Sequence, residues 1–174
     1  TTAANGTIVL SGGTLRFIGD MAQSTDRVLN VTGASGLQTT GSAPITFIGG
    51  ITEGGNTLTL GGNGQGYISG TGTITGTKGL TEQGLPGSGP WTNPPSVTNT
   101  FTGAITVNAG TLALDYSNLA TPANLVSSAV TLTLGGGTLS LLGKSTGVTA
   151  TTQNLGTLSF TKDTGSVLSL DANG

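Results

Sequence analysis

The sequence predicts an all-β fold, a parallel β-helix (β-solenoid), and three observations support this prediction. Short segments alternate apolar residues with Thr, Ser or other small residues, as expected for strands with one buried face. The 174 residues include 34 Thr, which favours strands, and 32 Gly, which suits tight turns. Apolar positions also repeat every 26–27 residues in the C-terminal half. Such a period is typical of solenoids and propellers.

Twelve segments have the alternation of strands, with Leu, Ile, Val or Phe two residues apart in most of them. Glycine or another turn-forming residue separates neighbouring segments. The expected strands are residues 6–10, 13–17, 28–31, 45–48, 56–60, 72–76, 104–107, 110–114, 130–134, 137–141, 156–160 and 167–170.

The repeat indicates how these strands are arranged. Ile105 and Leu132 are 27 residues apart, and Leu158 follows Leu132 after 26 more. In a solenoid such positions stack in an internal ladder, with Thr and Ser outside and Gly at the corners. A propeller blade needs about four antiparallel strands in a longer repeat, so we favour the solenoid. A β-sandwich remains the structural alternative.

Three longer segments are expected to leave the coils as loop excursions, near residues 18–27, 84–97 and 115–128. The second contains four of the six Pro and the only Trp. Insertions of this kind emerge from a solenoid without disturbing its stacked coils. We therefore expect residues 1–174 to form a single β-solenoid segment. Because the chain begins at Thr1 rather than Met, we expect it to be part of a longer chain.

Charge excludes some classes of partner. Five basic residues spread over the chain do not provide the patch that a nucleic-acid backbone or an anionic membrane surface requires. No apolar run approaches the roughly 18 residues of a membrane-spanning helix. The absence of Cys excludes a disulfide scaffold.

Catalytic groups are scarce. Without His or Cys the chain has neither a Ser-His-Asp nor a Cys-His arrangement. Only Asp20 and Asp26, among seven carboxylates, are close in sequence, and they could serve as a pair for glycoside cleavage. We favour the interpretation that all seven are solvated loop charges. The sequence therefore predicts no enzyme and no catalytic residue.

Motifs for metals and cofactors are also missing. "GGNGQG" (61–66) is similar to calcium-binding glycine-rich repeats, but it lacks the Asp that each turn of those repeats needs. We expect it to be a corner. "GTGTITG" (70–76) does not have the G-x-G-x-x-G spacing of a phosphate-binding loop. No metal and no cofactor is expected.

Two aromatic residues are the candidates for binding. Trp91 in its Pro-rich loop, and Tyr116 in the next excursion, could stack on a sugar or on a partner surface. The alternative, which we favour, is that Trp91 folds back to cover the edge of a coil.

One part of the chain resembles a known family. "GLTEQG" (79–84) and "NTFTGAITVNAGTLAL" (99–114) resemble the autotransporter-associated β-strand repeat, which occurs in the passenger regions of bacterial autotransporters. The residues that carry the resemblance are Gly79, Leu80, Thr81, Gly84, Asn99, Thr100, Phe101, Thr102, Gly103, Thr106, Val107, Asn108, Ala109, Gly110, Thr111, Leu112 and Leu114. Glu82 stands where the family usually has Lys, and a Pro/Trp loop replaces the expected intervening strand.

The resemblance implies a right-handed parallel β-helix at the bacterial cell surface, which a separate translocator domain exports through the outer membrane. In that family the repeat is associated with passenger transport and stalk formation. We therefore expect a non-enzymatic extracellular stalk or adhesin segment, with host or matrix glycans and proteins as partners. One alternative is a self-assembling subunit of an extracellular filament or sheath, joined end to end through exposed terminal strands. Another is a glycan-binding or glycan-cleaving β-helix.

Overall fold

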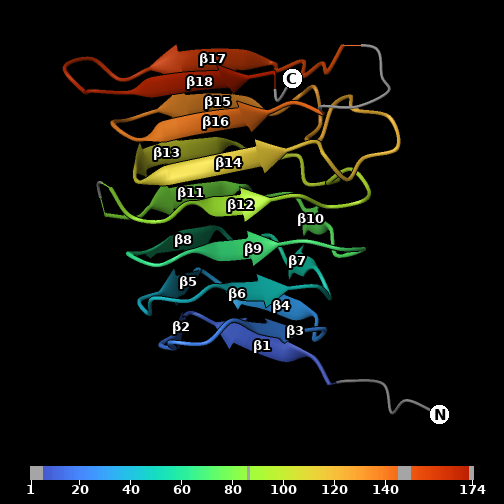
Figure 1. Cartoon of the computed structure of the whole chain (residues 1–174), viewed down its shortest axis with the longest axis vertical. Coiled ribbons are helices and arrows are strands. Elements are labelled where there is room, and N and C mark those ends of the chain that lie inside the picture. The colour runs from blue at the N-terminus through green and yellow to red at the C-terminus, as the bar shows by residue number, and fades with distance from the viewer. Residues whose placement is uncertain (1–5, 86, 145–149, 173–174) are drawn as a thin grey trace.

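The computed structural model describes residues 6–85, 87–144 and 150–172, and within these ranges it contains strands but no helix. All strand pairs are parallel, and successive strands wind into coils that stack along the long axis of the molecule (Figure 1). The first coil contains β1 and the last contains β17 and β18. The predicted all-β, parallel β-solenoid fold is confirmed.

The strands form three sheets, named here A, B and C. Sheet A consists of β1 (Ile8–Ser11), β4 (Leu29–Gly33), β7 (Ile51–Glu53) and β10 (Ile74–Gly76). Sheet B consists of β2 (Thr14–Phe17), β5 (Ser35–Thr39), β8 (Leu58–Gly62), β11 (Leu80–Gln83), β13 (Ile105–Ala109), β15 (Thr131–Leu134) and β17 (Thr157–Phe160). Sheet C consists of β3 (Gln23–Thr25), β6 (Ile45–Phe47), β9 (Gly66–Ile68), β12 (Trp91–Asn93), β14 (Thr111–Asp115), β16 (Thr138–Leu142) and β18 (Val167–Asp171).

Residues that face the interior stack in columns across the coils. One column of sheet B, the Phe160 column, consists of Leu15, Leu37, Leu60, Glu82, Val107, Leu134 and Phe160. Beside it on the outer face, a second column consists of Thr14, Gly36, Thr59, Thr81, Thr106, Thr133 and Ser159. Apart from Glu82 inside and Gly36 outside, apolar residues thus stack inside and hydroxyl-bearing residues outside, as the alternation predicts.

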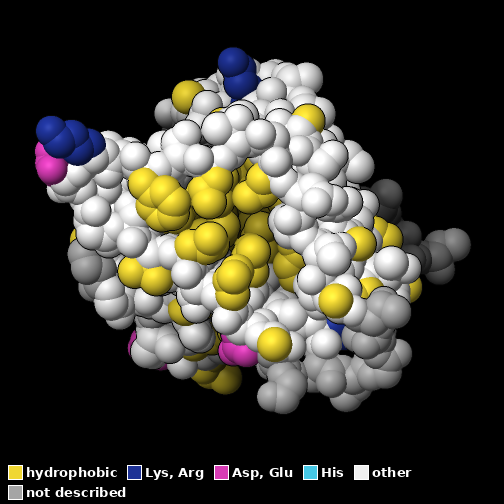
Figure 2. Space-filling view, turned by 90° about the horizontal axis from the view of Figure 1, so that it is seen from above, with side chains coloured by type: hydrophobic (Ala, Val, Ile, Leu, Met, Phe, Trp, Pro, Cys, Tyr) yellow, Lys and Arg dark blue, Asp and Glu magenta, His cyan; other side chains and the backbone are white. Residues whose placement is uncertain are grey.

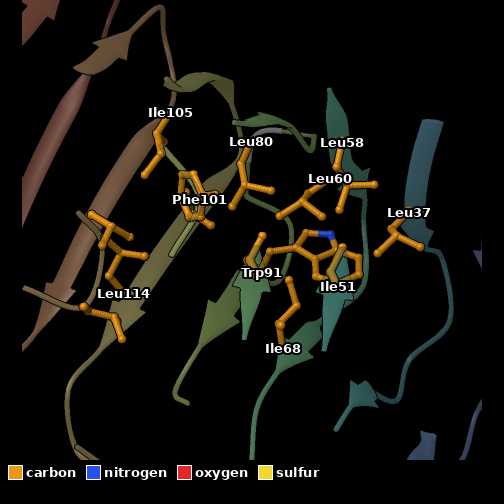
Figure 3. Close-up of a cluster of buried hydrophobic side chains, with 14 of the residues drawn as sticks. Leu37, Ile51, Leu58, Leu60, Ile68, Leu80, Trp91, Phe101, Ile105 and Leu114 are labelled. Atoms are coloured by element: carbon orange, nitrogen blue, oxygen red, sulfur yellow. The ribbon is translucent and has the colours of Figure 1, made fainter. Parts of the chain in front are cut away.

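The sequence repeat and the strand register agree. Ile105 pairs with Leu132 and Leu132 with Leu158, so the 26–27-residue period is one turn of the solenoid. The interior between the sheets is filled by aliphatic side chains and by Trp91 and Phe101 (Figure 3).

The third side of the solenoid changes after β10. In the next coil, residues 99–101 lie on the same side of the solenoid as β10, but they do not form a strand in the described part of the chain. Main-chain bonds still join the coils, because Phe101 N–H donates to the carbonyl of Ile74 (3.2 Å) and Asn99 N–H to that of Leu125 (2.9 Å). The coils with β1–β12 therefore have three sheet-forming sides, and the later ones have two sheets closed by irregular segments.

Six strands were not expected from the alternation: β3, β5, β7, β9, β11 and β12. They are short or rich in Gly, Ser, Gln and Asn, so their own pattern is weak. Two expected excursions are corrected by this finding, since 18–27 contains β3 and 84–97 contains β12. Pairing with strands of adjacent coils supplies the extended conformation that these segments do not specify alone.

Candidate functional site

Trp91 lies in the core and not on a loop surface. It occupies the middle of a sheet C column, paired with Gly66 on one side and Leu112 on the other. Its side chain is 2% exposed, its indole N–H donates to the carbonyl of Gly61 (3.0 Å), and its ring stacks on Phe47 with 6.3 Å between centroids. Trp91 therefore has no free face for a sugar or a partner.

Tyr116 is also buried, directly after β14. Its hydroxyl donates to Oε1 of Gln153 at 2.7 Å, and Gln153 in turn bonds both backbone groups of Val126. Burial raises the pKa of Tyr116 well above its usual range. Neither predicted aromatic contact is available at the surface, so a glycan-binding function has no support from these two residues.

Asp20 and Asp26 are exposed on either side of β3. Asp20 accepts a hydrogen bond from the Ser42 hydroxyl at 3.2 Å. No metal-binding group of three or more acidic residues occurs within the described ranges. The glycine-rich segment 61–66 forms the corner between β8 and β9, with Gly62 at φ +101°, as predicted.

Two carboxylates contradict the prediction that all seven are solvated. Glu53 and Glu82 are each 1% exposed. Glu82 lies in the Phe160 column between Leu60 and Val107, and Glu53 pairs with Val31 in sheet A. The signal was present in the sequence, since each Glu follows an apolar residue two positions earlier and so shares its inward face.

Burial determines the protonation of these two groups. It raises the pKa of Glu53 from 4.5 to about 8, and that of Glu82 from 4.5 to about 8 against the lowering effect of a hydrogen bond from Gly84 N–H. That bond, to Oε1 of Glu82, is 2.7 Å long. Both groups are therefore mostly protonated in the folded protein at neutral pH.

The C-terminal coil exposes the interior of the solenoid. In the Phe160 column, Val107 and Leu134 are fully buried, whereas Phe160 is 57% exposed. Leu132 is 1% exposed but Leu158, its partner in the last coil, is 40% exposed. Figure 2 shows hydrophobic side chains gathered in the middle of this end of the molecule. Neither β17 nor β18 pairs with a further strand in the described part of the chain.

We call this surface the open end and define it by Leu158, Phe160, Leu168 and Leu170, with the free edges of β17 and β18. A cavity of about 440 Å³ beside it is lined by Leu141 and Leu170 together with polar residues such as Lys144, Gln153 and Asp171. Its chemistry fits another β-coil, which would pair with the free edges and cover the apolar side chains. The open end is therefore the candidate functional site.

Comparison of the chain with protein-family models, curated proteins and solved structures finds no match. A helix of the length and apolarity needed to cross a membrane does not occur among the described residues.

Proposed function

We propose that this chain is a non-enzymatic structural segment of an extracellular bacterial surface protein, built like an autotransporter passenger. Its role is to extend a stalk. The observation that carries the proposal is the open end, where side chains from buried columns are left exposed. A surface of this kind is stabilised when a further coil stacks on it.

The proposed mechanism is mechanical. Parallel main-chain ladders run through seven strands in each of sheets B and C. Stacked apolar side chains, such as Ile105, Leu132 and Leu158, hold each coil to the next, while the outer face carries mainly Thr, Ser and Gly. Each coil contacts only its neighbours, so length is added without rearranging the coils already present.

The proposed role of the open end as a stacking surface is tested by measuring whether the isolated chain self-associates. We expect concentration-dependent association of the isolated chain, measured by light scattering, and its loss in a Leu158→Ser/Phe160→Ser variant that keeps the wild-type circular dichroism spectrum. Ile18→Ser/Met21→Ser removes two exposed apolar side chains from the first coil region and serves as the matched control. A wild-type chain that remains monomeric at all concentrations would contradict the proposed stacking surface.

Surface location is tested separately. We expect the chain, placed between an export signal and an outer-membrane translocator domain, to be stained by antibody on intact bacteria. Retention inside the cell, with the same carrier displaying an unrelated β-helix, would count against the passenger role.

A filament subunit is the second candidate, because the open end could also receive the first coil of another copy. In that first coil the inward sheet C positions are Gln23 and Thr25, aligned with Ile45 and Phe47 of the next coil. These polar side chains fit the apolar open end poorly on the sheet C side, whereas Ile8, Leu15 and Phe17 of the same coil are apolar and only partly buried. The mismatch therefore counts against the filament on one side of the solenoid only. Electron microscopy distinguishes the two proposals. Filaments that are lost on substitution at either end of the solenoid support the filament subunit. Small oligomers that are lost only on substitution of Leu158 and Phe160 support the stalk.

A further inference from the structure

We propose that Glu53 and Glu82 make the middle of the solenoid responsive to pH. While both carboxyl groups keep their protons, the coils around β7 and β11 stay closed, that is, with their strands paired. In alkaline solution, loss of the protons opens these coils by local unfolding. This conformational device is independent of whether the chain serves as a stalk.

The geometry leaves these two groups without compensation for a charge. Both oxygens of Glu53, and Oε2 of Glu82, are buried without a hydrogen-bond partner in the structure. Their column neighbours are uncharged and carry no polar side chain: Val31 and Gly76 for Glu53, and Leu60 and Val107 for Glu82. A carboxylate in such surroundings loses the solvation of water and gains little in return, so ionisation opposes the folded state.

Glycine makes room for one of the two carboxyl groups. A Cβ at Gly84 would lie 2.7 Å from Oε1 of Glu82, and one at Gly110, in the next coil, would lie 2.9 Å from it. Gly110 also has φ +69°, a conformation that favours glycine. The coil that contains Glu82 and the next coil are therefore shaped around its side chain in the closed arrangement.

No opposite charge faces either group from the strands packed against it. Glu53 is flanked by β4 and β10, and Glu82 by β8 and β13; none of these four strands contains Asp, Glu, Lys or Arg. The same is true of β5, β9 and β12. Lys78, before β11, is exposed, and Asp115, at the end of β14, is partly exposed. Tyr67 on β9 is aligned with Thr92 in an outward column.

The direction of the pH effect follows from proton binding. Folding raises the pKa of both groups from 4.5 to about 8 through burial. Between these values the unfolded chain has released protons that the folded chain retains, so stability decreases as pH rises. The stabilising effect of the protons is complete below about pH 4.5 and is lost by about pH 8. Because solenoid coils contact only their neighbours, we expect the loss to appear first as local opening.

The test compares the wild-type chain with Glu53→Gln, Glu82→Gln and the double variant, since Gln keeps the shape of the protonated acid and does not ionise. Urea unfolding is measured from about pH 5 to about pH 9. We expect the wild-type midpoint to fall with pH, by up to about tenfold in the unfolding constant per pH unit for each Glu. The slope should be smaller in each single variant and absent in the double variant.

Asp163→Asn, which neutralises an exposed carboxylate, is the matched control and should keep the wild-type slope. A second measurement does not depend on the variants folding: the infrared band of a protonated carboxyl should be present in the native wild-type chain near neutral pH and disappear in alkali. Hydrogen exchange, corrected for its intrinsic pH dependence, should show β7 and β11 opening first. A flat wild-type pH profile, a double variant that retains the slope, or absence of the infrared band would overturn the proposal.

Discussion

At the scale of single residues, the core depends on pairs in which one side chain occupies the space that its neighbour leaves. Trp91 and Gly66 are such a pair. They are aligned in adjacent coils, and a Cβ at Gly66 would lie 2.5 Å from Cε3 of the Trp91 ring. Glycine at position 66 is therefore required by the indole in the next coil and not by backbone strain.

Because of this pairing, substitutions at Gly66 and Trp91 should have non-additive effects on stability. Gly66→Ala should destabilise the chain by about 1–3 kcal/mol, because the added methyl group meets the Trp91 ring. In a Trp91→Leu background the same change should have little effect, since Leu already occupies that column at Leu112 and Leu139. Urea unfolding of the four chains measures the coupling. Equal effects of Gly66→Ala in both backgrounds would show that the indole is not the cause.

At the scale of elements, side chains replace strand pairing where sheet A ends. Asn99 is buried, and its Oδ1 accepts a hydrogen bond from Ile74 N–H at 2.9 Å. Its Nδ2 donates to Oδ1 of Asn93 and to the carbonyl of Leu125. One amide thus joins β10, β12 and the irregular segment of the following coil, and it allows the third side to change from strand to loop.

Loss of this bridge should be measurable. Asn99→Leu leaves the N–H of Ile74 buried without a partner, so we expect a loss of about 1–3 kcal/mol in the free energy of unfolding. Asn63→Leu, at an exposed corner position, is the control and should change stability by less than about 0.5 kcal/mol. If the two changes had similar effects, the amide bridge would not be a structural requirement of the transition.

At the scale of the whole molecule, the two ends differ. The first coil places Gln23 and Thr25 at inward positions of sheet C, whereas the last coil places Leu168 and Leu170 in the same columns. Leu170 is 72% exposed. The inward columns of sheet C are therefore polar in the first coil and apolar in the last.

The loss of stability caused by substituting a residue of the Phe160 column with Ala should depend on the position of its coil along the axis. Leu134→Ala, in the Phe160 column, removes a fully buried side chain and should destabilise by about 2–5 kcal/mol. Phe160→Ala, one coil later, should have a much smaller effect in the isolated chain. When a further coil is stacked on the open end, the loss of stability caused by Phe160→Ala should become larger. Thermal unfolding of both variants, with and without one additional coil, measures this difference; equal losses in the isolated chain would contradict it.

Strands with a clear local pattern are those that the sequence predicts correctly. The twelve segments with alternating apolar residues all contain strands, and the 26–27-residue period is the register between coils. Segments with a weak pattern are not predicted. The alternation in "ITE" and "LTE" places Glu53 and Glu82 on the inward face, against the general tendency of carboxylates to be solvated. The Pro-rich surroundings of Trp91 similarly obscured β12.

The alternation of inward and outward residues follows from the sequence alone, because adjacent side chains of a strand point to opposite faces whatever lies around them. Contacts between coils settle which weak segments are strands, where Trp91 lies, and which carboxylates are buried. These outcomes depend on contacts with coils 22 or more residues away, such as Leu60 with Glu82 and Gly66 with Trp91. The open end is another such outcome, since Leu134 is covered by β17, whereas Phe160 in the same column has no described coil above it.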